Sequence, residues 1–265
     1  MDRPFIFCHM ETSLDGKIMG KYLWIPETNT TDDSFFAVAY GPKAEYTFQA
    51  VIEGRTTVDD NITCYEKPPV DEAAAPFPEG DFLAPGASLG RFFLAVDGSG
   101  RLAWKKNTAD EGGITAHVVE VITERASNGY KDFLRKMGIS YLICGKDHVD
   151  LPLLCHKVKT LLHVESMLLG GGAVLNWSFI QAGLVDEVSQ VIAAAADGNP
   201  STQTLFMAKP GITTDQPVVF QPLSVRIMKD NAVWIRWKVG AKNTYDFDND
   251  PDYKAVQELI RTHRS

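Results

Sequence analysis

The sequence predicts a single α/β domain with a mostly parallel central sheet, flanking helices and an antiparallel hairpin at its C-terminal end. Three observations predict this class. Short apolar runs alternate with helical patterns along most of the chain, which is typical of parallel strands joined by helical crossovers. The last two apolar runs instead flank the turn residues Asp230 and Asn231, which indicates a hairpin on the edge of the sheet. A glycine triplet, Gly170–Gly172, joins a strand pattern to a helix pattern.

The first half of the chain contributes strands and one long excursion. Residues 65–90, rich in proline and glycine, are expected to form a surface loop rather than a linker between domains. A helix is expected over 33–48. The expected strands cover 4–10, 50–53, 91–96 and 117–122.

The second half continues the alternation up to the hairpin. The expected helices cover 128–137, 151–161, 174–182 and 253–262. The expected strands cover 140–144, 163–169, 185–195, 217–228 and 232–239. Four aspartates between 246 and 252 suggest calcium, but they lack the glycine and the distal glutamate of an EF-hand loop. An acidic connector followed by a surface helix is the better interpretation of the tail.

The composition excludes several classes of function. The chain has 265 residues, of which 45% are apolar, and its formal charge is −8, from 26 basic and 34 acidic residues. This balance fits a folded protein and argues against disorder and against a nucleic-acid partner, which needs a basic surface. No apolar run approaches the roughly 20 residues of a membrane-spanning helix, and the start resembles no secretory signal. We therefore expect a cytoplasmic location and no membrane partner.

The four cysteines, Cys8, Cys64, Cys144 and Cys155, are widely spaced and form no CxxC pair. Zinc ligands cluster at short spacings, so no metal site is expected. We expect reduced thiols.

The glycine triplet is the most informative local pattern. Gly170, Gly171, Gly172, Ala173 and Val174 place unhindered backbone N–H groups at a helix N-terminus. Such groups and the helix dipole attract a phosphate or pyrophosphate. Close packing between a helix and a strand is the alternative explanation of the glycines.

Two other strand ends carry hydroxyl and guanidinium groups. One is Gly54, Arg55, Thr56 and Thr57, and the other is Thr123, Glu124 and Arg125. Arginine binds phosphate bidentately, and ligands of open α/β sheets bind at the carboxyl ends of the strands. Together with the glycine triplet, these ends predict a site for one extended polyphosphate ligand. Ordinary turns are the alternative for each end taken alone.

A turn follows the first strand. It comprises Ser13, Asp15, Gly16 and Lys17, and Lys17 is the nearest cation to the end of that strand. The spacing alone does not separate a functional lysine from a solvated one, or the Asp-Gly pair from a plain turn.

These patterns together resemble the RibD C-terminal type of reductase, within the dihydrofolate-reductase-like superfamily. The resemblance rests on Ser13–Lys17, on Gly54–Thr57, and on Leu169–Asn176 followed by Ala182–Glu187, and it covers about residues 4–240. It implies one dihydrofolate-reductase-like domain over 1–240, with residues 241–265 as acidic connector and C-terminal helix. It also implies NADPH as the hydride donor and a homodimer, for which Val233, Trp234 and Ile235 are candidate interface residues.

The resemblance assigns roles residue by residue. The positions that it implies for NADPH are Ile18, Gly20, Gly54, Arg55, Thr56, Thr57, Thr123, Glu124, Arg125, Gly170, Gly171, Gly172, Ala173 and Val174. The positions implied for catalysis are Lys17 and Asp15, and those implied for the substrate are Ser13, Trp24, Glu27 and Asp59. His9 and Glu27 are further candidate proton donors. Two strand ends with arginine favour NADPH over NADH, because the additional phosphate needs cations.

The chain departs from the riboflavin-pathway members at the substrate. Those reductases carry a glutamate where Gly170 stands, an arginine where Glu45 stands, and an arginine near Asn61, all used for the ribose phosphate. The pattern is closer to an uncharacterised branch of the family. The expected function is an NADPH-dependent oxidoreductase similar to the 5-amino-6-(5-phosphoribosylamino)uracil reductase of riboflavin biosynthesis. Its substrate would be a small molecule, with a heterocyclic, carbonyl or imine group as hydride acceptor.

Two alternatives remain. Dihydrofolate reductase has a segment like Trp24–Glu27, but Glu27 falls two positions short of the acid expected there. A non-catalytic NADPH-binding protein would also account for the missing arginines.

Overall fold

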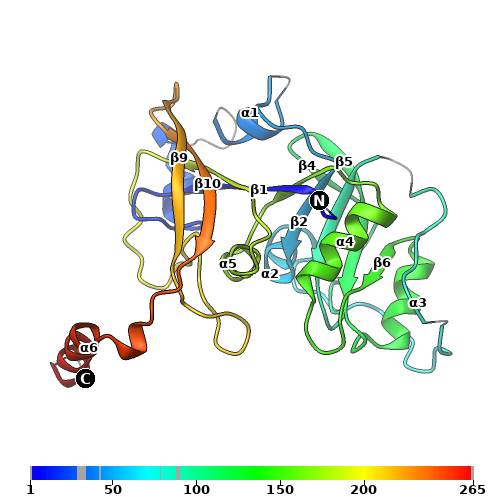
Figure 1. Cartoon of the computed structure of the whole chain (residues 1–265). Helices are drawn as coiled ribbons and strands as arrows, with labels where there is room; N and C mark the ends of the chain where they lie inside the picture. The colour runs from blue at the N-terminus through cyan, green and yellow to red at the C-terminus, as the bar shows by residue number, and fades with distance from the viewer. Residues whose placement is uncertain (1, 29–33, 42, 78, 88–89, 264–265) are drawn as a thin grey trace.

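The computed structural model describes residues 2–28, 34–41, 43–77, 79–87 and 90–263. Its centre is one sheet in the order β4-β5-β3-β2-β7-β1-β8-β10-β9, with β6 paired to the second half of β5 (Figure 1). The strands are β1 Phe5–Thr12, β2 Ala50–Gly54, β3 Phe92–Val96, β4 Thr108–Glu111, β5 Ile114–Ile122, β6 Ser140–Ile143, β7 Ser166–Leu169, β8 Glu187–Ile192, β9 Val218–Ile227 and β10 Val233–Lys242.

Seven of these strands, from β6 through β5, β3, β2, β7 and β1 to β8, run parallel. They are apolar and buried on both faces, as expected for strands covered by helices on each side. Because they are parallel, their carboxyl ends meet at one edge of the sheet. The antiparallel hairpin of β9 and β10 continues the sheet beyond β8, so the predicted fold class and edge hairpin are confirmed.

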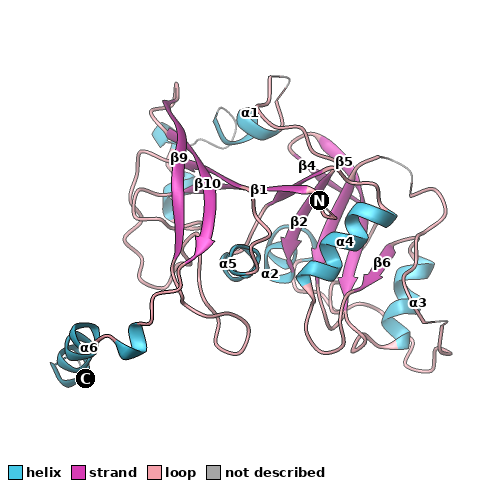
Figure 2. Cartoon of the chain, viewed as in Figure 1, coloured by secondary structure: helices cyan, strands magenta, loops and turns pink. Residues whose placement is uncertain are grey.

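Helices and short helical turns connect the strands and flank the sheet (Figure 2). They are α1 Phe36–Ala39, α2 Arg55–Val58, α3 Asn128–Lys136, α4 Leu151–Leu161, α5 Ala173–Gln181 and α6 Pro251–His263, with 3₁₀ turns at Lys21–Trp24, Pro26–Thr28 and Phe247–Asn249 and a π turn at Asp59–Thr63. Side-chain caps start two of them. Ser127 accepts a hydrogen bond from the Tyr130 N–H (3.1 Å) ahead of α3, and Asp150 accepts one from the Leu153 N–H (2.9 Å) ahead of α4.

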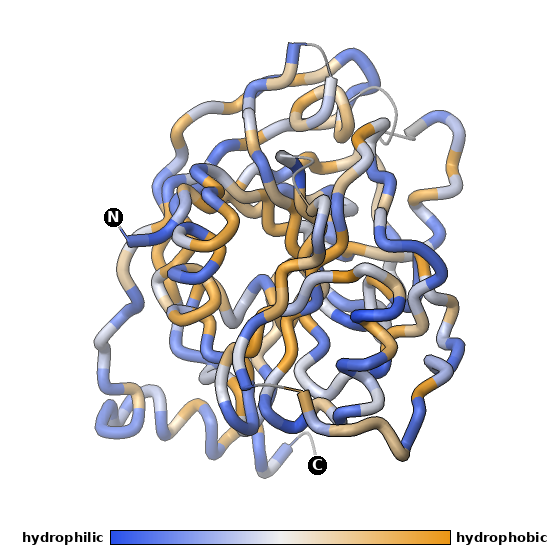
Figure 3. The backbone as a smooth tube through the Cα atoms, turned by 90° about the vertical axis from the view of Figure 1, so that its right-hand side faces the viewer, coloured by the Kyte–Doolittle hydropathy of each residue, from blue (hydrophilic) through white to orange (hydrophobic). Residues whose placement is uncertain are grey.

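The core lies on both faces of the sheet, because alternate strand residues point to opposite sides. On one face Phe7, Val51 and Phe93 pack with side chains of α3 such as Phe133. On the other face Ile6, Ile52 and Leu94 pack with Leu154 of α4 and Phe179 of α5. Figure 3 shows the apolar stretches gathered inside the molecule and the hydrophilic ones in its outer loops.

Part of the predicted secondary structure is wrong. The helix expected over 33–48 is confined to α1, Phe36–Ala39; residue 33 lies outside the described residues. Beyond it, Tyr46 and Phe48 point into the core next to Phe7 from an extended segment, and their burial outweighs local helix propensity. Strand β4 was not expected, although Gly112 and Gly113, both with positive φ, form the turn that joins it to β5.

The tail projects from the body of the molecule (Figure 1). Every side chain of α6 is exposed, including Val256, Leu259 and Ile260. The four cysteines are free thiols, three of them buried. Within the described ranges no helix has the length and apolar character needed to cross a bilayer.

Candidate functional site

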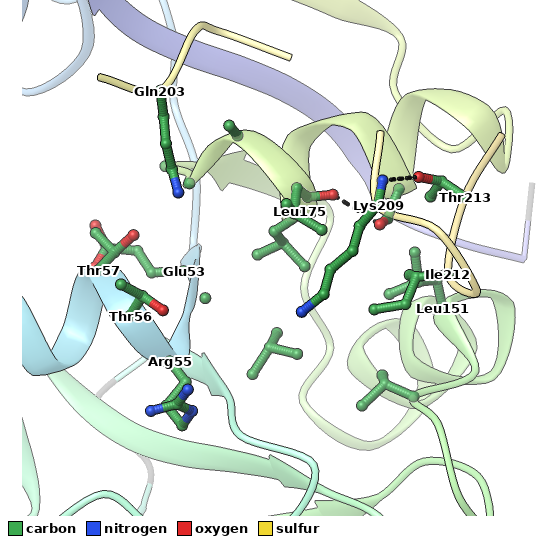
Figure 4. A pocket seen from close by; sticks show the side chains of 18 of the residues that line it. Glu53, Arg55, Thr56, Thr57, Leu151, Leu175, Gln203, Lys209, Ile212 and Thr213 are labelled. Atoms are coloured by element: carbon green, nitrogen blue, oxygen red, sulfur yellow. Dashed lines mark hydrogen bonds between the residues drawn. The ribbon is translucent and has the colours of Figure 1, made fainter. Parts of the chain in front are cut away.

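A cavity of about 1450 Å³ opens at the carboxyl edge of the parallel strands. Its walls come from the ends of β1, β2, β3, β5 and β7, from the start of α5, and from the loop between β8 and β9 (Figure 4). A cavity of this size and position is where an α/β sheet binds an extended ligand.

The glycine triplet forms one wall of the cavity. The N–H of Gly54 donates a hydrogen bond to the carbonyl of Gly171 (2.8 Å), which ties β2 to the turn after β7. Gly171 has φ +107°, and a Cβ there would lie 3.2 Å from Met10 Cε. The peptide bond between Gly171 and Gly172 is cis. At position 171, therefore, glycine fits without backbone strain or displacement of Met10, and a larger residue does not.

The turn leads directly into α5, which has Gly172 as its N-cap and hence no side-chain cap. Within the described residues the N–H groups of Ala173 and Val174 have no acceptor. Thr57 and Gln203 both face the turn, because a Cβ on Gly172 would lie 3.5 Å from Thr57 Oγ1 and 3.6 Å from Gln203 Oε1. Free N–H groups at a helix N-terminus, with polar side chains beside them, suit a phosphate.

Positively charged side chains surround the same wall. Arg55 lines the cavity and is held by Asp59, whose carboxylate lies 3.1 Å from its guanidinium. Lys209 extends its side chain into the cavity on the side facing Arg55 (Figure 4), and its backbone N–H is fixed by Thr213 Oγ1 at 2.9 Å. Arg125 lines the cavity at the end of β5. We call the glycine turn with Arg55, Arg125 and Lys209 the cationic end.

Two carboxyl groups also line the cavity, one of them beside the glycine turn. Glu53, the penultimate residue of β2, is only 7% exposed, and Glu111 ends β4. The hydroxyl of Tyr40, just after α1, donates a hydrogen bond to Glu111 Oε1 (2.7 Å). We call Glu53, Glu111 and Tyr40 the acidic end.

The surroundings of Glu53 and Glu111 raise the pKa values of both carboxyl groups. Burial, with the charge of Glu111 as a second cause, raises the pKa of Glu53 well above its ordinary value. Burial also raises the pKa of Glu111, against the opposing effect of the Tyr40 hydrogen bond. Perturbed carboxyls in a cavity are typical of functional sites.

His9 lies beside this end but has no free nitrogen. Its Nδ1 is 2.9 Å from Ser189 Oγ and its Nε2 is 2.9 Å from the carbonyl of Phe35, whose ring stacks on the imidazole at 4.4 Å. Burial lowers the pKa of His9 to about 4, so the ring is neutral at neutral pH. Its contacts position Phe35 on the wall of the cavity.

The turn after β1, which contains Asp15 and Lys17, does not line the cavity but makes hydrogen bonds to the loop after β8. Asp15 accepts hydrogen bonds from the N–H groups of Asp197 (2.9 Å) and Gly198 (3.0 Å) and from Ser13 Oγ (2.7 Å), which lower its pKa to about 2. Lys17 Nζ donates to the carbonyl of Thr202 at 3.2 Å. This loop continues to Gln203, so Asp15 and Lys17 support a wall of the cavity from behind.

The structure brings most of the positions expected for a cofactor to one cavity. The lining includes Ile18, Gly54, Arg55, Thr56, Thr57, Thr123, Arg125, Gly170, Gly172, Ala173 and Val174. The positions that do not line it are Ser13, Asp15, Lys17, Gly20, Trp24, Glu27, Asp59, Glu124 and Gly171. Trp24 is 86% exposed, Glu27 is exposed, and Asp59 is buried between Arg55 and Thr63.

Sequence reasoning missed several lining residues. Glu53 and Glu111 were overlooked, although a carboxylate that closes a buried apolar run, as Glu53 does, is an unusual pattern. Gln203, Lys209 and Thr213 come from a loop without periodicity, so no local pattern marks them.

Comparison with known proteins gives the family resemblance independent support. The RibD C-terminal domain matches residues 98–228, which confirms the resemblance noted in the sequence. This region includes the end of β5, the glycine turn and α5, and it excludes Arg55.

Solved structures share the fold. RibD of Acinetobacter baumannii is 18% identical with a TM-score of 0.57, over 90% of this chain and 58% of that chain. A pyrimidine reductase-like protein from Corynebacterium diphtheriae is 15% identical with a TM-score of 0.59, over 90% of this chain and 93% of that chain. The riboflavin biosynthesis reductase Rib7 of Saccharomyces cerevisiae is 14% identical with a TM-score of 0.55, over 91% of both chains. This chain thus spans less than two thirds of the Acinetobacter protein.

Proposed function

We propose, on the premise that residues 98–228 match the RibD C-terminal domain, that this chain is an NADPH-dependent oxidoreductase acting on a small heterocyclic, carbonyl or imine acceptor. One observation carries the proposal: uncapped N–H groups at the start of α5 share a cavity with Arg55, Arg125 and Lys209. The cavity volume, about 1450 Å³, is large enough for a dinucleotide and an acceptor together. The fold shared with the yeast riboflavin biosynthesis reductase and with the pyrimidine reductase-like protein supports the same conclusion.

The residues of the cationic end fit the charges of NADPH. The N–H groups of Ala173 and Val174 would bind the pyrophosphate, and Thr57 would add a hydroxyl donor beside them. Arg125, with Lys209 as a second cation, would bind the 2′-phosphate, which favours NADPH over NADH. When bound, NADPH supplies the hydride. The chain's own contribution is to hold and orient the reactants in a cavity away from bulk water.

Residues behind the wall enter the proposal as positioning residues. Asp59 holds Arg55 by an ion pair (3.1 Å). Asp15 and Lys17 hold the loop that carries Gln203. We propose that Lys17 acts through this loop, so that its loss changes cofactor affinity more than it changes proton transfer.

The substrate is proposed to differ from the ribose phosphate of riboflavin biosynthesis. Glu45, where the resemblance predicts an arginine, forms an ion pair with Arg226 of β9 and lies outside the cavity lining. At position 45, therefore, this chain supplies no cation to the cavity. A non-catalytic NADPH-binding protein is the second candidate, and this missing cation is the observation that favours it.

Titration with NADPH and with NADH, followed by cofactor fluorescence, tests the proposal. NADPH should bind at least about tenfold more tightly than NADH, since the additional phosphate meets a cationic wall. An acceptor series of pyrimidines, pterins and quinones, followed by loss of absorbance of the reduced nicotinamide, then separates an enzyme from a binding protein. Equal affinities for both nucleotides, or no binding of either, would contradict the proposal.

The proposed homodimer would use strand β9. This strand ends the sheet and exposes Val219, Val225 and Ile227 by 59%, 59% and 80%. Trp234, an expected interface residue, is instead buried and donates a hydrogen bond to Ser189 (2.9 Å). Light scattering of V225K/I227K should give a monomer if β9 pairs two copies, because charges on an edge strand prevent pairing. V256K on α6 is the control.

A further inference from the structure

Three separate segments fix the acidic end of the cavity. Glu53 comes from β2 and lies beside the glycine turn, since a Cβ on Gly170 would be 3.2 Å from Glu53 Oε1. Glu111 comes from β4. Tyr40 packs its ring against Gly112, where any Cβ would collide with it, and against Phe48 at 5.4 Å. The carboxyl groups are therefore held by rigid elements and not by flexible surface side chains.

The hydrogen bonds at this end are incomplete. Glu111 Oε2 is buried without a partner, and Glu53 makes no hydrogen bond or ion pair within the described residues. Buried carboxyl groups are normally paired, because an unpaired one loses its hydration without compensation. A ligand with N–H donors would supply what the two carboxyl groups lack.

Within the described residues no cation forms an ion pair with Glu53 or Glu111, and no cation is among the causes that shift their pKa values. Glu11 and His9 of β1, Tyr40 after α1 and Arg55 of α2 line the same cavity. His9 is neutral and Tyr40 is a neutral donor. Arg55 already pairs with Asp59.

We propose that Glu53 and Glu111 bind the hydride acceptor, and that they select an acceptor with a basic nitrogen group, of amidine or imine type, over an anionic one. A planar cation with several N–H donors can donate charge-assisted hydrogen bonds to both carboxyl groups. Phe35, which is stacked on His9, and Met10 offer apolar walls for its ring. A phosphate in the same place would meet two carboxylates at low dielectric, which is strongly unfavourable.

The inference deepens the proposed function, because it names the substrate class of the same cavity. It can be tested without the natural substrate. Benzamidine is a planar amidinium, benzamide is its neutral analogue, and benzoate is its anionic analogue. Ligand-observed NMR titration of the full chain with each compound measures the affinities of three ligands that have nearly the same shape and different charges.

Benzamidine should bind at least about tenfold more tightly than benzamide. Benzoate can bind only through the cationic end, so its affinity should not depend on Glu53 or Glu111. Glu53→Gln and Glu111→Gln should each weaken benzamidine about tenfold, while Glu72→Gln, an exposed control outside the cavity lining, should leave it unchanged. Benzamidine affinity should also rise with pH, because protons compete with the amidinium for the two carboxyl groups. Benzamidine binding no tighter than benzamide binding, or Glu53→Gln binding benzamidine normally, would overturn the proposal.

Thermal melting shows whether each variant is folded. Glu53→Gln removes a costly buried ionisation, so its stability at neutral pH should be at least that of the parent chain. NADPH titration of the same proteins separates the two proposals. NADPH binding without benzamidine binding refutes the acidic site alone, and Glu53-dependent benzamidine binding without NADPH binding refutes the cofactor alone.

Discussion

The cationic end and the acidic end of the cavity differ in charge and in how far their charged side chains are buried. The cationic end uses backbone N–H groups at a helix start and long side chains that keep contact with water, such as Arg55, whose side chain is 38% exposed. The acidic end uses short side chains inside the protein, and Glu53 is 7% exposed. Exposed cations cost little stability and can be replaced one at a time. Buried carboxyls couple ligand binding to stability and to pH.

The largest effect is expected at the glycine turn. Gly171→Ala should weaken NADPH binding at least about a hundredfold, because its φ of +107° and Met10 Cε at 3.2 Å both oppose a Cβ. Gly183→Ala is the matched control. Gly183 also has positive φ, +67°, but a Cβ there meets nothing within 4 Å, and it stands at the opposite end of α5 from the glycine turn. It should lose stability and retain affinity. Normal NADPH affinity in Gly171→Ala would remove the turn from the cationic end.

The next largest effect concerns His9, which makes the free energy of unfolding depend on pH. The folded pKa of His9 is about 4, below the ordinary 6.5, so its contribution to stability is complete above about pH 6.5 and is lost as the pH falls toward 4. The loss amounts to about 3 kcal/mol. Urea unfolding of His9→Gln across this range should give a flatter curve, since glutamine does not ionise. An unchanged slope would assign the acid sensitivity to other groups.

Single cations should have smaller effects than the glycine turn. Arg55→Ala and Lys209→Ala should each weaken NADPH binding about tenfold, with less effect at high salt. Arg261→Ala, on the exposed helix α6, is the control and should bind normally. If one of the two variants loses all binding, the cationic end depends on that side chain and is not shared among several groups.

The same contrast explains what the sequence could predict. The glycine turn and Arg55 follow strands directly, so local pattern and strand order suffice to bring them together. The range of α4, 151–161, was also predicted from the sequence. Glu53 and Glu111 lie 58 residues apart and meet only because β4 folds back on β5 and Tyr40 packs on Gly112. That hairpin and the extended segment after α1 depend on tertiary packing, which local propensity does not contain.

The smallest effect should come from Tyr40→Phe. This change removes the donor to Glu111 Oε1 (2.7 Å) and leaves the ring against Phe48. Losing one such hydrogen bond costs about 1 kcal/mol. The hydroxyl stabilises the charged form of Glu111, so its loss raises the pKa of Glu111 further. The stability deficit should therefore grow as the pH rises from 5 to 8, because ionised Glu111 then has no donor. A deficit independent of pH would mean that Glu111 stays protonated throughout, and the acidic end would then present one ionisable carboxyl group to its ligand, that of Glu53.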